Sequence, residues 1–308
     1  MEKYMVIVNP VSANGRTGRN WPHIAEELKN AGLKFDARLT SNPGEAVQLT
    51  RKAIQEGYLN IVAVGGDGTL NEVLNGFFES DDARPVNPEA RLGLIPSGTG
   101  RDFIKTINYS RDIRDVSRTL ARNQTRTIDV GQVRYMDAEG RQASRYFINV
   151  AGMGMDAETV DRVNRTTKVF GGKISFLWGT IATLVQYRNR ELTLEIDGVA
   201  CYHGEATMVA VANGQYFGGG MRIAPEASLD SGHFDIVVVD GMTKLEILAN
   251  LYRIYLGSHL SHPRVHLMRG KHIRSTSSQK VFLQVDGEQP GVLDAEFELL
   301  PRKLQLIC

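Results

Sequence analysis

The chain has 308 residues, 42% of them hydrophobic and 23% charged, which is the composition of an ordinary globular protein with enough chain for two domains. Its 36 lysines and arginines nearly balance its 35 aspartates and glutamates, so the basic excess on which nucleic-acid binding depends is missing. We therefore expect no nucleic-acid partner. Cys201 and Cys308 lie far apart in the sequence and indicate neither a disulfide framework nor a zinc site.

The sequence contains no recognisable targeting or membrane-spanning segment. The first residues, MEKYMVIVNP, lack a charged leader followed by a long apolar stretch. No window approaches the ~20 apolar residues of a membrane helix. We predict a cytoplasmic protein that meets membranes only peripherally, from outside.

The first part of the chain alternates strands with helices. Apolar runs predict strands at residues 4–8, 34–39, 59–64 and 91–95. Helices are expected at residues 21–32, opened by Trp21-Pro22, at 41–57, and after the glycine-rich strings that follow the third and fourth strands. This alternation predicts a mostly parallel sheet, in which ligands bind beyond the carboxyl ends of the strands. Glycine-rich loops follow the first, third and fourth strands, after Val8, Val64 and Ile95, so one ligand can meet all three.

From about residue 128 the pattern becomes β-rich. A hairpin is expected from two segments, residues 128–135 and 145–150. Further strands are expected at residues 192–196, 206–212, 234–239, 265–268 and 281–285, and helices at about 174–188 and 244–256. We predict an α/β protein whose second domain is largely antiparallel.

Two suggestive patterns in this second part carry less weight. The string GMGMDA (residues 152–157) matches a dinucleotide-binding fingerprint, but no acidic residue follows at a suitable strand end. We expect Asp156 in a loop there, facing a cleft or holding a turn. The histidines His259, His262 and His266 are interpreted as a solvated surface, because a proline interrupts any helix that would align them.

The string GGDGTLNEVLNG, residues 65–76, carries the strongest chemical signal. Its paired glycines let the backbone approach phosphate groups closely, and the following helix offers free N–H groups and a positive dipole end. Asp67 places a carboxylate where phosphates and Mg²⁺ would meet. Thr69 is expected to cap the helix or to contact the nucleotide. The string therefore predicts a nucleotide-binding loop.

These motifs resemble those of a known family. GGDGTLNEVLNG resembles the nucleotide-binding motif of the diacylglycerol kinase catalytic domain, and GTGRDF (residues 98–103) resembles that family's second loop. The segment from Asn213-Gly214 through GGGMRIAP is similar to its third signature, and Asp286-Gly287-Glu288 to its D-G-E string. The motifs stand in the family's order over nearly the whole chain, and the resemblance is strongest to the small soluble bacterial lipid kinases.

The resemblance implies an architecture and an activity. Residues 1–127, rejoined by a last strand within 299–308, would form a nucleotide-binding domain similar to phosphofructokinase and NAD kinase. Residues 128–298 would form a β-sandwich domain for the lipid substrate. The implied reaction uses ATP and Mg²⁺ to phosphorylate the hydroxyl of diacylglycerol or a related membrane lipid, giving phosphatidic acid or an analogue.

Residue roles follow from the same resemblance. ATP would contact Thr40, Gly65, Gly66, Asp67, Gly68, Thr69, Leu70, Asn71 and Thr99. Asp67 and Asp102 would organise Mg²⁺ and the phosphates. Glu288 matches the residue taken as the general base, and Asp286 matches a further essential carboxylate. Because a carboxylate of pKa roughly 4 is a weak base, Glu288 is better described as orienting the hydroxyl and accepting its proton during transfer.

The sequence departs from the family pattern at two places. Arg101 stands where the family usually has asparagine, and its charge can reach a phosphate or alter the nucleotide contact. The family's accessory metal loop reads Ser-Leu-Asp-Ser-Gly-His here, with Ser231 in place of the usual carboxylate. Because serine is a poor ligand for Mg²⁺, we expect weak binding at best. Its candidate ligands are Ser228, Ser231 and His233, with Asp230 one residue out of place.

Several alternatives stay open at this level. The apolar string ISFLWGTIATLV is interpreted as a core helix or as the border of an acyl-chain cleft. The basic residues around it can approach anionic headgroups or form a solvated rim: Arg162, Arg165, Lys168, Lys173, Arg188 and Arg190. An NAD kinase and a non-catalytic lipid or nucleotide sensor remain competing functions. The acceptor lipid and the oligomeric state, a homodimer among the options, are not determined by the sequence.

Overall fold

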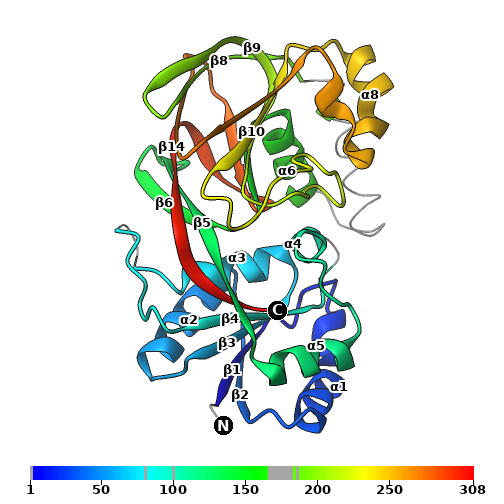
Figure 1. The fold of residues 1–308 in the computed structure, drawn as a ribbon, viewed down its shortest axis with the longest axis vertical. Coiled ribbons are helices and arrows are strands. Elements are labelled where there is room, and N and C mark those ends of the chain that lie inside the picture. The colour runs from blue at the N-terminus through cyan, green and yellow to red at the C-terminus, as the bar shows by residue number, and fades with distance from the viewer. Residues whose placement is uncertain (1–2, 80–81, 99–100, 166–182, 185–186) are drawn as a thin grey trace. The chain divides into compact units, whose positions relative to one another are not determined.

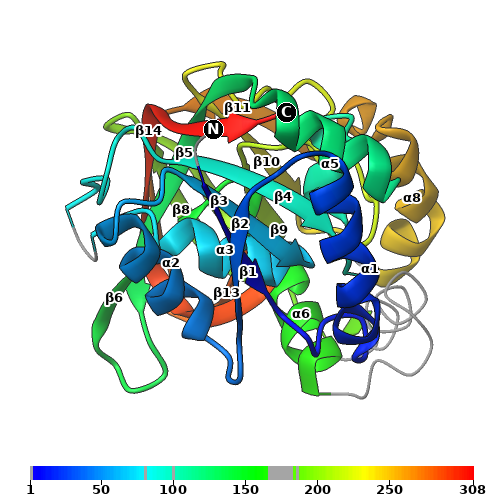
Figure 2. The ribbon, with the colours of Figure 1, turned by 90° about the horizontal axis from the view of Figure 1, so that it is seen from below.

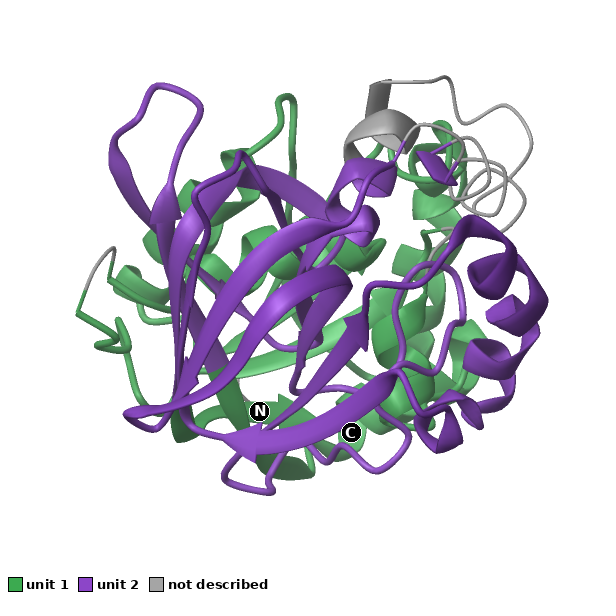
Figure 3. Cartoon of the chain, turned by 90° about the horizontal axis from the view of Figure 1, so that it is seen from above, with its two compact units in different colours: residues 1–130, 300–308 green, residues 131–299 purple. Residues whose placement is uncertain are grey.

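The computed structural model describes residues 3–79, 82–98, 101–165, 183–184 and 187–308. The chain divides into two compact units (Figure 3). Unit 1 comprises residues 1–130 and 300–308, and unit 2 comprises residues 131–299. Two long strands, β5 (Thr125–Met136) and β14 (Glu288–Ile307), run from one unit into the other (Figure 1).

Unit 1 is built on a parallel sheet in the order β2-β1-β3-β4-β14. Its strands are β1 (Tyr4–Val8), β2 (Phe35–Leu39), β3 (Asn60–Gly65), β4 (Arg91–Pro96) and the last residues of β14, where Gln305 and Leu306 pair in parallel with Arg91 and Leu92. Its described helices are α1 (Arg16–Asn30), α2 (Glu45–Gln55), α3 (Asp67–Asn75), α4 (Asp102–Thr106) and α5 (Ile113–Arg122). In Figure 2, α1 and α5 lie on one side of the strands and α2 and α3 on the other. Both faces of the sheet are therefore covered, which explains why β1 and β3 are buried along their whole length.

Helix α1 differs from its prediction. It begins at Arg16 and contains Pro22, whereas the sequence indicated a start at Trp21-Pro22. The reason is packing: Thr17, Ile24 and Leu28 form one buried face of the longer helix. Ile24 and Leu28 join a core with residues of β1 and β3, and this burial outweighs the one backbone hydrogen bond that Pro22 removes.

Helix α5 was not predicted at all. Asp112 caps it, because its carboxylate accepts hydrogen bonds from the backbone N–H groups of Arg114 at 2.8 Å and Asp115 at 3.4 Å. Val116 and Leu120 are buried and pack into the same core as α1. This helix thus closes the second half of one face of the parallel sheet.

Unit 2 is a mostly antiparallel β structure. Its strands are β6 (Gln142–Phe147), β7 (Val150–Gly154), β8 (Arg190–Ile196), β9 (Val199–Ala212), β10 (Phe234–Asp240), β11 (Val265–Gly270), β12 (His272–Thr276) and β13 (Phe282–Val285), with the adjoining parts of β5 and β14. The main path runs β11-β10-β9-β7-β13-β14, while β12 joins β14 to β8 and β8 pairs with β9. The predicted hairpin of β5 and β6 is confirmed, and β12 is an additional strand.

Strand β9 separates two apolar cores in unit 2. Val209 and Val211 belong to the core enclosed by the strands. Met208, Ala210 and Ala212 face the opposite way, into a second core that includes residues of the helix α8 (Lys244–Leu256). Because side chains alternate along a strand, this part of β9 is apolar at every position and is buried on both faces.

Two further expectations for unit 2 were wrong. Asp156 does not lie in a loop but in the first turn of the helix α6 (Met155–Arg165), where it is buried. His259 is not solvated either: it lies buried in the short helix η1 (His259–Ser261), and its Nε2 donates to the carbonyl of Ile223 at 2.9 Å. Helix α8 matches its prediction, and most of the helix expected at 174–188 lies outside the described residues.

In the described part of the chain, no helix is both long and apolar enough to cross a membrane.

Candidate functional site

Three loops of unit 1 meet at the carboxyl edge of its parallel sheet. Beyond the end of β1, the backbone N–H of Asn9 donates to the carbonyl of Val64 at 3.0 Å. Beyond β4, the N–H groups of Ser97 and Gly98 both donate to the carbonyl of Gly65, at 2.8 and 3.0 Å. The loops after β1, β3 and β4 are thus tied to one another by backbone hydrogen bonds, as the alternation of strands and helices predicted.

The glycines of these loops are required by close packing. A Cβ atom on Gly98 would lie 2.2 Å from the Cα of Gly66, and one on Gly65 would lie 2.4 Å from Oγ1 of Thr69. Neither position can hold a side chain without moving the backbone or Thr69. The two loops therefore present bare backbone to the edge of the sheet, which is the arrangement that lets a phosphate group approach closely.

Asp67 and Asp102 are brought together although 35 residues separate them in the sequence. The backbone N–H of Asp102 donates to Oδ2 of Asp67 at 3.1 Å, which draws the start of α4 against the loop after β3. The carboxylate of Asp102 is itself buried and lies 2.7 Å from Nζ of Lys105. The predicted pair of carboxylates therefore shares one loop cluster, with one lysine beside it.

Positive charge gathers around the same loops. Nε of Arg101 donates to the carbonyl of Gly98 at 2.7 Å. Burial lowers the pKa of Arg101 below its ordinary value, the nearby charges of Arg111 and Arg16 lower it further, and Asp67 acts in the opposite direction. The guanidinium of Arg101 is thus repelled by the charges of Arg111 and Arg16, and an anion bound here would relieve that repulsion. Sequence reasoning missed Arg16 and Arg111, although Arg16 opens α1 directly after the loop that follows β1.

Arg101 has an unusual backbone conformation. Its φ of 60° and ψ of 36° place it in the left-handed region, immediately before α4. Asparagine adopts this conformation more readily than arginine, so the family's usual residue has a conformational explanation. Arginine at this position strains the backbone and adds a positive charge.

Two further predicted nucleotide contacts, Thr69 and Asn71, lie on helix α3. Helix α3 begins at Asp67 without a side-chain cap, so the expected capping role of Thr69 is wrong. Instead, Oγ1 of Thr69 accepts a hydrogen bond from Nδ2 of Asn9 at 3.0 Å, a partner that the sequence did not indicate. Asn71 is buried, and Nδ2 of Asn75 donates to its backbone carbonyl at 2.8 Å.

Further predicted contacts lie along the same edge. The N–H of Thr40, beyond the end of β2, donates to the carbonyl of Val8 at 2.9 Å. Gly68 lies in the first turn of α3, and Thr99 lies outside the described residues. A hollow of about 260 Å³, counting the part that opens to solvent, is bordered by Ala63, Gly65, Gly66, Asp67, Leu70, Leu94, Pro96, Arg101 and Ile104.

In unit 2, Asp286 and Gly287 form a two-residue turn between β13 and β14, and Glu288 follows it as the first residue of β14. Asp286 and Gly287 have φ angles of 47° and 86°, and Val285 pairs with Glu288 across the turn. The carboxylate of Asp286 accepts backbone N–H bonds from Ile148 at 3.2 Å and from Asn149 and Val150 at 3.1 Å. The carboxylate of Asp286 thus holds the segment that leads into β7, and its expected part in the chemistry stays a prediction.

The segment that Asp286 holds carries one buried asparagine, Asn149, and a second buried asparagine, Asn213, bonds to this segment from just beyond the end of β9. Nδ2 of Asn149 donates to the carbonyl of Tyr216 at 2.7 Å, and Nδ2 of Asn213 donates to the carbonyl of Ile148 at 3.0 Å. The N–H groups of Asn213 and Gly214 both donate to the carbonyl of Asn149. The third signature and the D-G-E turn therefore form one cluster, with Glu288 at its edge and half-buried. Sequence reasoning missed Asn149, although it directly precedes a predicted strand end.

The accessory metal loop of unit 2 satisfies its own polar groups. Oγ of Ser228 donates to Oδ1 of Asp230 at 2.7 Å, and Oγ of Ser231 donates to the carbonyl of His233 at 2.8 Å. His233 Nε2 lies 3.7 Å from Oδ1 of Asp235. Across the described ranges, no three histidine, cysteine or acidic side chains are grouped so as to hold a metal ion. Binding of a metal ion by Ser228, Asp230, Ser231 and His233 stays a prediction, and both serine hydroxyls already donate hydrogen bonds within the loop.

Unit 2 also contains an apolar pocket with a buried carboxylate at its wall. The space measures about 720 Å³, counting the part that opens to solvent. Its lining includes Met155, Met208, Phe217, Met221, Val239, Met242, Ile247, Leu251, Ile254 and Val265, together with the polar residues Asp156, Thr159, Thr207, Asn250, Arg253, His259 and His262. Oδ2 of Asp156 accepts a hydrogen bond from Nε2 of Gln284 at 3.3 Å, and burial raises the pKa of Asp156 to about 7.

Each of the two units matches a known protein family. The diacylglycerol kinase catalytic domain matches residues 3–133, and the YegS C-terminal NAD kinase beta sandwich-like domain matches residues 149–308. A diacylglycerol kinase of Staphylococcus haemolyticus is 30% identical over 98% of this chain and 86% of its own length. That of Bacillus subtilis is 28% identical over 100% of this chain and 96% of its own.

Solved structures show the same fold. A diacylglycerol kinase from Bacillus anthracis superposes with a TM-score of 0.70 at 22% identity, covering 99% of this chain and 96% of that one. An NAD kinase from Archaeoglobus fulgidus, in complex with ATP, gives a TM-score of 0.52 at 12% identity, covering 100% of this chain and 94% of that one.

The fold defines the class first: an α/β domain joined to a β-sandwich-like domain, the fold shared with the diacylglycerol kinase and NAD kinase structures. Within that class, the full-length matches are decisive. The chain belongs to the diacylglycerol kinase family.

Proposed function

We propose that this protein transfers the γ-phosphate of ATP, with Mg²⁺, to the hydroxyl of diacylglycerol or a related lipid. The observation that carries the proposal is the loop cluster of unit 1, in which Gly65, Gly66 and Gly98 leave bare backbone beside Asp67 and three arginines. Membership of the diacylglycerol kinase family supports the lipid as acceptor.

The phosphates of ATP bind, in this proposal, against the loops after β3 and β4. Helix α3 begins at Asp67 within this loop cluster, and the amino-terminal end of a helix attracts negative charge through its backbone N–H groups and its dipole. Arg101 supplies a cation held in place by its bond to Gly98. Phosphoryl transfer depends mainly on positioning and on neutralising the charge of the phosphates, and both are provided by these groups.

Mg²⁺ would be held through Asp67, with Asp102 beside it. The donor set fits this ion, because Mg²⁺ prefers carboxylate and water oxygens and usually binds through one or two carboxylates plus substrate phosphates. The bound ion would neutralise charge on the phosphates. Asp102, linked to Asp67 through its own N–H, keeps the Asp67 carboxylate oriented, and Lys105 balances the second negative charge.

Glu288 is proposed to orient the acceptor hydroxyl and to take its proton as the bond to phosphorus forms. Its position next to a rigid turn suits this role, because Asp286 anchors the turn to three backbone N–H groups. Asp286 itself acts as a positioning residue.

The apolar pocket of unit 2 supports a lipid acceptor. Four methionines and several branched aliphatic side chains line it. Methionine side chains adapt their shape to different apolar ligands, as acyl chains of varied length and unsaturation require. We propose that this pocket receives part of an acyl chain.

The test is transfer of radiolabel from [γ-³²P]ATP to a total lipid extract and to diacylglycerol in mixed micelles, followed by identification of the labelled product. Phosphatidic acid from diacylglycerol is the expected result, with activity lost in Asp67→Ala and Glu288→Ala. Activity that survives both substitutions would refute the assigned roles.

The same purified protein can be used to test the two competing functions. Incubation with NAD and ATP would yield NADP if the protein were an NAD kinase. Measurable ATP binding without turnover on any lipid of a broad panel would indicate a non-catalytic sensor. Either result would replace the lipid kinase proposal.

A further inference from the structure

Helix α8 carries a stripe of apolar side chains that faces solvent. Leu245, Leu248, Tyr252, Tyr255 and Leu256 have exposed fractions of 79%, 47%, 61%, 39% and 68%. At 3.6 residues per turn, these five positions fall within an arc of about 100° on one side of the helix. They are also five of the eight large hydrophobic side chains counted as exposed in the described part of the chain. Such a concentration on one helix marks an interaction surface rather than scattered surface residues.

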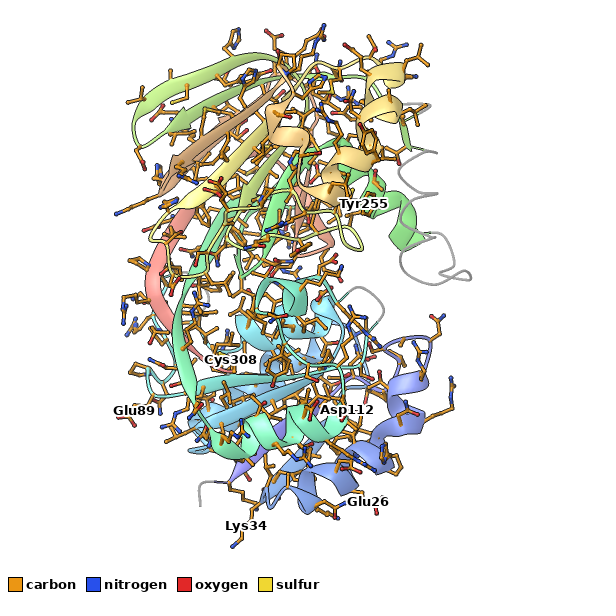
Figure 4. The ribbon with its side chains drawn as sticks, turned by 45° about the vertical axis from the view of Figure 1, so that its right-hand side comes forward. Glu26, Lys34, Glu89, Asp112, Tyr255 and Cys308 are labelled. Atoms are coloured by element: carbon orange, nitrogen blue, oxygen red, sulfur yellow. The ribbon has the colours of Figure 1, made fainter. Side chains whose placement is uncertain are left out.

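The opposite face of α8 is also apolar, and it faces into unit 2. Ile247, Leu251 and Ile254 line the apolar pocket of unit 2. The helix is therefore apolar on both sides, although a helix at a protein surface is normally apolar on one side only. Figures 1 and 2 show α8 at the outer margin of unit 2, and Figure 4, turned to bring this side forward, labels Tyr255 on it. The helix forms a single layer between the pocket and the outside.

We propose that the outer stripe of α8 docks on the surface of a lipid bilayer. This inference rests on the proposed function, because a kinase for a membrane lipid must reach an acceptor that lies in a bilayer. Leucine side chains enter the boundary between headgroups and acyl chains, and tyrosine rings settle at that depth with their hydroxyl groups toward water. The inner face then offers an apolar lining one helix away from the membrane.

The charges of α8 match an anionic lipid surface. The helix carries Lys244 and Arg253 against a single acidic residue, Glu246. Glu246 completes the capping box with Thr243 and lies 3.7 Å from Arg264, so its charge is balanced locally. The guanidinium of Arg253 donates to neutral groups, Oδ1 of Asn250 and Oγ of Ser261, both at 3.4 Å. The surplus is therefore positive and borders the apolar stripe, which favours phosphatidylglycerol-containing bilayers over neutral ones.

The test compares three proteins for binding to vesicles by co-sedimentation. They are the unaltered chain, the double variant Leu248→Ser/Tyr252→Ser, and Val199→Ser as a matched control, since Val199 is 62% exposed elsewhere in unit 2. Vesicles are made of phosphatidylcholine with and without phosphatidylglycerol. Because the substituted side chains are exposed, folding is expected to persist, and circular dichroism checks it. We expect the double variant to lose binding by about tenfold or more and Val199→Ser to bind normally.

Activity on two forms of the acceptor separates docking from catalysis. With a short-chain diacylglycerol dissolved in water, the double variant should keep the kcat/KM of the unaltered protein, and it should lose activity only on diacylglycerol embedded in vesicles. Unchanged vesicle binding by the double variant overturns the docking proposal. So does light scattering that shows a dimer dissolved by the substitutions, because the stripe would then bind a second copy of the chain.

The two proposals fail in different ways. If the unaltered protein binds vesicles through α8 but phosphorylates no lipid in either form, the proposed kinase function is refuted and the docking proposal is retained. If the unaltered protein phosphorylates diacylglycerol and the double variant does so equally well in vesicles, the docking proposal is refuted and the proposed kinase function is retained.

Discussion

The buried carboxylate of Asp156 makes the stability of unit 2 depend on pH. Its pKa is raised from 3.8 to about 7, chiefly by burial, while hydrogen bonds from Gln284 and from the N–H of Ala157 oppose the shift. The packing around it is close, because a Cβ on Gly152 would lie 1.9 Å from Oδ2 of Asp156. Ionising this group inside the fold is therefore costly, and the cost can be removed by a neutral side chain of the same shape.

The sign and size of the effect follow from the two pKa values. Because the pKa is higher in the folded state than in the unfolded state, the folded state is favoured most below pH 3.8, and that advantage is lost as the pH rises to about 7. The difference between the two values corresponds to about 4 kcal/mol of unfolding free energy. We expect the Asp156→Asn variant to gain stability relative to the unaltered chain by about 2 kcal/mol near pH 5.5 and about 4 kcal/mol above pH 7, on top of any pH-independent change.

The assay is urea unfolding at a series of pH values from 4 to 8. Hydrogen exchange in peptides covering β7 and α6 is the readout, so that the measurement reports unit 2 alone. Glu205→Gln is the matched control, since it removes one negative charge from an exposed position on β9. A stability difference between Asp156→Asn and the unaltered chain that stays constant from pH 4 to 8 would refute the reasoning, because Asp156 would then titrate alike in the folded and unfolded states.

Three further substitutions test the site. Gly98→Ala should lower ATP affinity by about tenfold or more, measured by calorimetry, because its Cβ would lie 2.2 Å from Cα of Gly66, while Gly204→Ala, with ordinary contacts, should change nothing. Asp286→Asn should destabilise unit 2 by about 1–3 kcal/mol in thermal unfolding, since an amide cannot accept all three N–H bonds; an unchanged midpoint would contradict the anchoring role. Arg101→Asn should stabilise unit 1 by about 0.5–1 kcal/mol by relieving left-handed strain and should weaken ATP binding severalfold. Tighter ATP binding in that variant would show that Arg101 does not contact the phosphates.

Local patterns in the sequence were sufficient to predict much of the fold. Apolar runs located β1 and β3, helical spacing of Leu70, Val73 and Leu74 located α3, and these three side chains are buried as expected. The wrong or missing predictions have a common cause. Helix α1 includes Pro22 and α5 was overlooked because their formation depends on burial against the sheet, which a short sequence window does not contain.

The sequence by itself determined the glycine loops, the carboxylates beside them and the family, because these are written in contiguous strings of residues. Only the tertiary structure decided which of the acidic residues are committed to structure. Asp286 is separated by 136 residues from Val150, whose N–H it accepts, and Asp156 by 128 residues from Gln284. The environment of a carboxylate, and hence its charge state and role, depends on such distant partners and on exclusion of water, and neither is encoded in its neighbours along the chain.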